Sequence, residues 1–132
     1  MRVFVDSSAI FAFLDEADVN HRRAVTWLGR ARKTDTQLFT HNYVVVEATA
    51  LSRRRLGTEG TRRLLDDLAP AFEVMFIDRE LHRISAAAYK ASGLGPASFV
   101  DRASFELMRE EGVSEAFAFD RHFEAEGFTL VA

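Results

Sequence analysis

In the stretch Val3-Phe4-Val5-Asp6-Ser7-Ser8-Ala9 (residues 3–9), an apolar run of strand length comes first. A polar turn follows it directly, and a segment with helical spacing begins at Ala9. The same change recurs along the chain, because apolar runs alternate with helical patterns. Further strands are predicted at 38–40, 72–77, 116–119 and 128–131, and helices at 9–15, 21–32, 43–55, 61–68, 81–91 and 99–110. This alternation predicts an α/β fold in which a parallel sheet of five strands is covered by helices on both faces.

A single domain over residues 1–132 accounts for the chain, of which 48% is hydrophobic, enough for one packed core. Turns are expected at Gly57, Gly60, 93–96 and Gly112, and no linker or repeat interrupts the pattern. No apolar run approaches the roughly 20 residues that span a bilayer. We therefore expect a cytoplasmic protein without a membrane partner. The absence of cysteine excludes thiol catalysis and thiolate metal ligation.

The positive charge is carried almost entirely by arginine, since the chain has only two lysines. The net charge of −3 argues against a generic polyanion binder. Arginines nevertheless gather at 53–55 and 62–63, and arginine is well suited to bidentate phosphate contacts. A solvated helix face explains this cluster equally well, so both interpretations stay open.

Three aspartates follow predicted strands: Asp6, Asp78 and Asp120. In open parallel sheets, functional residues gather beyond the carboxyl ends of the strands. An aspartate between a strand and a helix is also a good N-cap, and this explanation is favoured for Asp78. For Asp6 and Asp120 the capping and the functional interpretations are balanced. After Asp6, Ser7 and Ser8 could cap the next helix instead.

Glu47 and Asp101 are candidates of a different kind, since both lie in predicted helices. Residues three and four positions from Glu47 are apolar or aromatic, so its side chain projects from an apolar stripe. A buried unpaired carboxylate is costly, and a metal ion or a cleft would relieve the cost. The alternative is a helix that turns Glu47 to the rim of the core. Asp101 fits a capping box with Ser98, which does not exclude a role in a cleft.

Several carboxylates at one edge of a sheet would repel each other unless cations bind between them. Mg²⁺ and Mn²⁺ prefer oxygen ligands, and such ions promote phosphodiester hydrolysis. Other chemistries fit less well, because the chain has no glycine-rich phosphate loop and no Gly-x-Ser-x-Gly elbow. It also lacks the second aspartate of haloacid dehalogenase-type phosphatases and the late lysine of receiver domains. The acidic residues therefore favour a metal-dependent nuclease.

Four blocks of the sequence resemble PIN-domain proteins, particularly VapC-type ribonuclease toxins. The first block is residues 3–9, and the second runs from Thr40 to Glu47-Ala48. The third is Ser98-Phe99-Val100-Asp101-Arg102-Ala103-Ser104, and the fourth is Phe119-Asp120-Arg121-His122-Phe123, followed by Gly127-Phe128. The blocks come in the family's order and span nearly the whole chain.

The resemblance implies a PIN-like three-layer sandwich and an acidic site made of Asp6, Glu47, Asp101 and Asp120. Asp6, Asp101 and Asp120 would bind Mg²⁺ or Mn²⁺, and Glu47 would bind metal or orient the attacking water. Ser7, which would support the first aspartate or a phosphate, and Arg102 are the expected substrate contacts. The resemblance also implies an endoribonuclease toxin that acts on RNA, forms a homodimer and is silenced by a VapB-type antitoxin.

The chain departs from the family pattern at two positions. Many relatives carry a hydroxyl residue where this chain has Ala118, and the hydroxyl residue usual after Thr40 is replaced by His41-Asn42. Ala118 is the main support for an alternative function, a non-catalytic PIN-like module that binds RNA or protein. A DNA nuclease with the same site is a third option.

Overall fold

The computed structural model describes residues 1–132 as a three-layer α/β fold. All five strands are parallel, in the order β3-β2-β1-β4-β5. They are β1 (Arg2–Val5), β2 (Gln37–His41), β3 (Glu73–Met75), β4 (Glu115–Phe117) and β5 (Thr129–Leu130). The predicted fold class is therefore confirmed.

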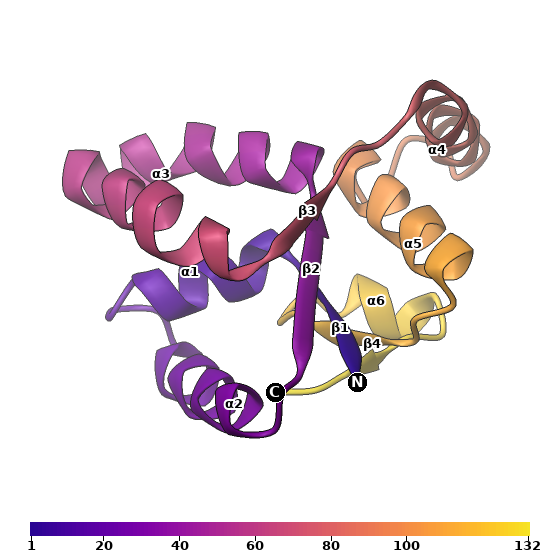
Figure 1. The fold of residues 1–132 in the computed structure, drawn as a ribbon. Helices are drawn as coiled ribbons and strands as arrows, with labels where there is room; N and C mark the ends of the chain where they lie inside the picture. The colour runs from indigo at the N-terminus through magenta and orange to yellow at the C-terminus, as the bar shows by residue number, and fades with distance from the viewer.

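Helices cover both faces of this sheet. Figure 1 shows α1, α2 and α3 gathered on one side and α4 and α5 on the other. The α-helices are α1 (Ser7–Leu14), α2 (His21–Lys33), α3 (Asn42–Arg63), α4 (Arg79–Ala91), α5 (Phe99–Glu111) and α6 (His122–Ala125), and a π-helix η1 (Leu64–Leu68) and a 3-10 helix η2 (Ala69–Ala71) follow α3. No helix combines the length and the hydropathy that crossing a membrane requires.

β1 is the central strand, paired with β2 on one side and β4 on the other. Val3, Phe4 and Val5 are completely buried, as expected for a strand with helices on both faces. The chain first builds β2 and β3 on one side of β1, and then returns to add β4 and β5 on the other side. This reversal creates a topological switch point between the ends of β1 and β4, where such folds bind their ligands.

Aromatic side chains fill much of the core, including the completely or almost completely buried Phe4, Phe39, Phe105, Phe117 and Phe123. Phe105 and Phe123 meet edge to face, with ring centroids 5.0 Å apart. Since Phe123 lies in α6 and Phe105 in α5, this contact fixes the segment after β4 against the helix that carries Asp101.

Two local features differ from the expectation. The sequence indicated a turn at Gly60, but Gly60 lies within α3, which bends instead at Gly57, where φ is 71°. One residue is enough to bend the helix at Gly57, because glycine adopts positive φ without strain. Helix α6 was not predicted, since its four residues are too few to show helical spacing.

Candidate metal centre

Asp6 directly follows β1, and its side chain is 2% exposed. Its backbone N–H donates to the carbonyl of Phe117, which extends the pairing of β1 with β4. Its Oδ2 accepts hydrogen bonds from the backbone N–H of Ser8 at 3.1 Å and from the Ser8 hydroxyl at 2.6 Å. Asp6 is therefore the N-cap of α1, and neither Ser7 nor Ser8 takes that position. The cap turns the carboxylate toward the switch point.

The electrostatic surroundings of Asp6 are unfavourable for a negative charge. Burial raises the pKa of Asp6 to about 7, although the two hydrogen bonds from Ser8 oppose this change. The charges of Asp101 and Asp120 raise the pKa further. Coulombic effects of this kind require proximity, so three of the predicted site residues share one locality.

Asp101 lies in the first turn of α5, and the predicted capping box is confirmed. Its Oδ2 accepts a hydrogen bond from the backbone N–H of Ser98, and the Ser98 hydroxyl accepts one from the Asp101 N–H. The side chain is only 13% exposed. Burial raises the pKa of Asp101, and the charge of Asp120 adds to the effect. Asp101 therefore caps a helix and belongs to the acidic cluster.

Asp120 and Glu47 complete the cluster from two other elements. Asp120 lies between β4 and α6, and its Oδ1 accepts a hydrogen bond from the backbone N–H of His122 at 2.9 Å. Glu47 lies half-buried in α3, and its Oε1 accepts a hydrogen bond from the Ser7 hydroxyl at 3.1 Å. Burial raises the pKa of Glu47, and the charge of Asp101 raises it further.

Asp78, the remaining aspartate that follows a strand, has no part in this cluster. It caps α4, with its Oδ1 accepting a hydrogen bond from the backbone N–H of Leu81 at 2.8 Å. The N-cap interpretation of Asp78 is confirmed.

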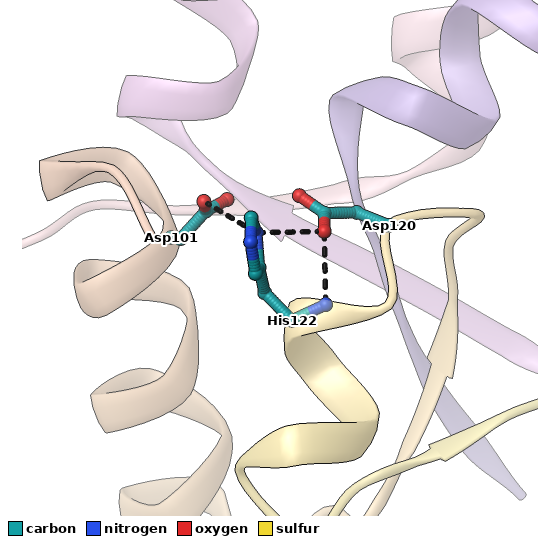
Figure 2. A group of neighbouring side chains, drawn as sticks. All are labelled: Asp101, Asp120 and His122. Carbon is teal, nitrogen blue, oxygen red and sulfur yellow. Dashed lines mark hydrogen bonds and ion pairs between the residues drawn. The ribbon is translucent and has the colours of Figure 1, made fainter. Parts of the chain in front are cut away.

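The donor set suits a hard divalent cation. Four carboxylates converge from the ends of β1 and β4 and from the starts of α3 and α5, and burial and mutual repulsion oppose ionisation of Asp6, Asp101 and Glu47. A cation would remove that penalty by balancing their charge. Figure 2 shows the carboxylates of Asp101 and Asp120 facing each other with the ring of His122 between them. The residues therefore fit an ion such as Mg²⁺ or Mn²⁺.

Sequence reasoning missed Ser8, which connects the two strands of the switch point. Its hydroxyl donates to Asp6 Oδ2 and accepts a hydrogen bond from the backbone N–H of Phe119 at 3.0 Å. Phe119 directly follows the buried Ala118, the position at which the family resemblance led us to expect a hydroxyl residue. The Ser8 hydroxyl, at the start of α1, thus binds the backbone directly after Ala118, which has no hydroxyl of its own. Ser7, predicted to support the first aspartate or a phosphate, donates a hydrogen bond to Glu47.

Replacing Ser8 with alanine is expected to move the pH dependence of activity to higher pH. Loss of the hydroxyl removes a hydrogen bond that lowers the pKa of Asp6, so protons compete more strongly with metal. It also leaves the N–H of Phe119 unpaired, which costs about 1–3 kcal/mol of stability. Cleavage rates measured across neutral and alkaline pH test this, with Ser92→Ala as the control, because Ser92 only bonds the Tyr89 carbonyl in α4. An unchanged profile for Ser8→Ala would contradict the role.

Arg102 lies beside the site but is engaged within the protein. Its guanidinium forms an ion pair with Glu126 at 2.6 Å, and its side chain is 15% exposed. Glu126 also pairs with Arg109 at 2.8 Å, so this group joins α5 to the end of α6. Contact of Arg102 or Ser7 with substrate stays a prediction. In the arginine cluster of α3, Arg55 pairs with Asp15 and Asp18.

A parallel α/β sheet with an acidic cluster at its switch point, where a divalent cation could bind, is an arrangement that suits metal-dependent hydrolases. The chain belongs to the PIN domain family, whose family model matches residues 3–128. It is 29% identical over 131 residues to the 23S rRNA-specific endonuclease VapC20 of Mycobacterium tuberculosis, covering 98% of this chain and 97% of that protein.

Solved structures agree with this assignment. The crystal structure of Mycobacterium tuberculosis VapC20, described as a Sarcin-Ricin loop cleaving toxin, superposes with a TM-score of 0.83. Its identity is 28%, and the match covers 96% of both chains. FitAcB from Neisseria gonorrhoeae has the same fold, with a TM-score of 0.72 at 17% identity over 100% of this chain and 97% of that chain.

Proposed function

We propose that this protein is an endoribonuclease that depends on Mg²⁺ or Mn²⁺ and acts as the toxin of a VapBC-type toxin–antitoxin pair. The observation that carries the proposal is the convergence of Asp6, Glu47, Asp101 and Asp120 on the switch point, with burial and mutual repulsion acting on their ionised forms. This arrangement suits hydrolysis of a phosphodiester, whose charge must be neutralised before water can attack.

Asp6, Asp101 and Asp120 are the residues that would hold the ion. A divalent ion bound there neutralises phosphate charge and lowers the pKa of a water molecule. Glu47 suits a proton-accepting role, because its raised pKa brings it closer to neutral pH and only its Oε1 is bonded to Ser7. Ser7 fixes the rotamer of Glu47, so the second carboxylate oxygen is available to orient the attacking water.

RNA is the proposed substrate class. The relative VapC20 carries the name of a 23S rRNA-specific endonuclease, and the likeness covers nearly the full length of both chains. The same relative is described as a toxin, which supports pairing of this chain with a VapB-type antitoxin. A homodimer remains a prediction that sedimentation analysis of the purified protein would test.

Removal of divalent ions is expected to stop RNA cleavage, because the acidic cluster alone would repel the phosphate. The test incubates purified protein with a structured RNA and a DNA oligonucleotide of the same sequence, with and without EDTA. Cleavage of RNA that EDTA abolishes and that Mn²⁺ or Mg²⁺ in excess restores is the expected result.

The other outcomes distinguish the alternative functions. RNA binding without cleavage under any metal condition would favour the non-catalytic module. Cleavage of the DNA strand at the same rate would favour a nuclease that does not discriminate between the two sugars. Cleavage that persists unchanged in EDTA would contradict the metal centre, and an Asp6→Asn preparation tested in parallel excludes a contaminating nuclease.

A further inference from the structure

His122 is the first residue of α6, and its ring lies between two carboxylates of the acidic cluster. Its Nδ1 is 2.8 Å from Asp120 Oδ1 and 3.9 Å from Asp101 Oδ2. Figure 2 shows the ring edge directed at both carboxylates rather than away from them. The imidazole is therefore part of the site, although the predicted metal ligands were all carboxylates.

The Nδ1 atom of His122 is buried and has no hydrogen-bond partner, despite its short distance to Asp120. Asp120 Oδ1 already accepts the hydrogen bond of the His122 backbone N–H. Buried polar atoms are nearly always satisfied, so an unsatisfied one beside two carboxylates calls for an explanation. Lone pairs of nitrogen and oxygen at this separation repel unless a proton or a metal cation lies between them.

The separations suit donors to one ion. Neighbouring ligands of an octahedral ion with bonds of about 2.1 Å lie about 3.0 Å apart, and opposite ligands about 4.2 Å. The distances of 2.8 Å and 3.9 Å are close to these two values. One donor atom each from Asp101, Asp120 and His122 lies within 4.8 Å of the others.

We infer that His122 Nδ1 is a direct ligand of the divalent ion held by Asp101 and Asp120, and that this nitrogen makes the centre select Mn²⁺ over Mg²⁺. This inference rests on the proposed metal-dependent function and deepens it by naming the ion. Mg²⁺ strongly prefers oxygen ligands and gives up its water reluctantly, whereas first-row divalent ions, Mn²⁺ included, also bind at sites that contain nitrogen. The ring nitrogen would therefore favour Mn²⁺ at a site that carboxylates alone leave open to both ions.

Pulsed electron paramagnetic resonance on the full chain loaded with one equivalent of Mn²⁺ tests the inference without measuring activity. A directly coordinated imidazole nitrogen modulates the electron spin echo of Mn²⁺. We expect this modulation in the wild-type protein, its loss in His122→Asn, and its retention in His82→Asn. His82 is the matched control because it is exposed and contacts Tyr43 rather than the acidic cluster.

The ion preference provides a second readout. Competition of Mg²⁺ against bound Mn²⁺ is expected to give a Mn²⁺ preference that falls about tenfold in His122→Asn and is unchanged in His82→Asn. The His122→Asn substitution keeps the hydrogen bond from the backbone N–H of residue 122 to Asp120, so the variant should still fold. If it does not fold, the wild-type spectrum alone still shows whether a nitrogen atom binds the ion.

The outcomes separate the inference from the proposed function. Mn²⁺ bound by the wild-type protein with no nitrogen modulation would overturn the role of His122, since the ring would then lie beside the carboxylates without binding the ion. It would leave the metal-dependent nuclease intact. Failure of the wild-type protein to bind Mn²⁺ or Mg²⁺ at all would overturn both.

Discussion

Asp6→Asn is expected to reduce RNA cleavage on the order of a thousandfold, the largest loss of activity for any single substitution in this chain. Asp6 is the most buried of the four carboxylates, so no water can take its place beside a bound ion. Asparagine keeps the shape of the side chain and still accepts the capping hydrogen bond from the Ser8 N–H. The loss would therefore reflect the missing charge, and initial rates at saturating Mn²⁺ would measure it.

The same substitution is expected to stabilise the metal-free protein at neutral and alkaline pH. In the folded protein the pKa of Asp6 is about 7, compared with an ordinary value of 3.8. As pH rises from about 4 to 7, the unfolded chain releases this proton before the folded protein does, so the wild type loses stability over that window. The asparagine side chain of the variant has no proton to lose, and the difference between the two proteins should vanish below about pH 4.

Thermal melting in EDTA at about pH 4 and about pH 8, on either side of that window, measures this effect. Mn²⁺ should reverse the order at the higher pH, because it binds the folded wild type more tightly than it binds folded Asp6→Asn and so stabilises the wild type more. Asp78→Asn is the control, since Asp78 caps α4 outside the cluster and asparagine caps equally well. Asp6→Asn protein that cleaves RNA normally, or that melts lower than the wild type in EDTA at the higher pH, would contradict the assignment.

His41→Ala is expected to produce the largest loss of stability, about 3–4 kcal/mol, together with a marked loss of activity. His41 is completely buried at the end of β2. Its Nδ1 accepts a hydrogen bond from the Val44 N–H, which caps α3, and its Nε2 lies 2.8 Å from the Ser104 hydroxyl in α5. Nε2 therefore carries the proton, and the ring joins the helix of Glu47 to the helix of Asp101.

His41→Asn separates the two contributions of this residue. Asparagine is an excellent N-cap but is too short to reach Ser104, so it should recover the capping energy of about 1 kcal/mol and not the bridge between helices. Burial lowers the pKa of His41 to about 3, compared with an ordinary value of 6.5. The wild type should therefore lose stability as pH falls below 6.5, where the unfolded chain binds a proton, and His41→Asn should lack this loss.

A double-mutant cycle between His41→Asn and Ser104→Ala tests the bridge directly. A coupling energy of at least about 0.5 kcal/mol in urea unfolding is expected for two side chains in contact. Additive effects on stability, with full activity in His41→Asn, would show that the ring only fills space. A lower kcat at unchanged KM is the signature expected of a residue that positions Glu47 and Asp101.

The site also shows that helix capping and metal binding are compatible interpretations of one residue. Asp6 caps α1, Asp101 completes the capping box of α5, and Asp120 accepts a hydrogen bond from the first residue of α6. A cap uses only some of the lone pairs of a carboxylate, so the others remain for an ion. When a sequence allows such a residue to be either a helix cap or a metal ligand, both interpretations can therefore be correct.

The sequence by itself determined the five strands and the longer helices of the fold, and the four carboxylates of the site. The apolar run of β1, the capping box at Ser98 and the cap at Asp78 are all recognisable from neighbours within a few positions. The carboxylates after strands and the apolar surroundings of Glu47 were visible in the same way. Helical and strand periodicity depend on contacts between near neighbours, so they leave a regular pattern in the chain.

Only the tertiary structure decided how these pieces meet. The Ser8 hydroxyl reaches the backbone of Phe119, 111 positions away, because β4 inserts beside β1 rather than beside β3. The pairing of Arg102 with Glu126 and the place of His122 in the acidic cluster follow from that insertion. Strand order results from many weak apolar contacts summed over the whole core, so no short stretch of residues encodes it.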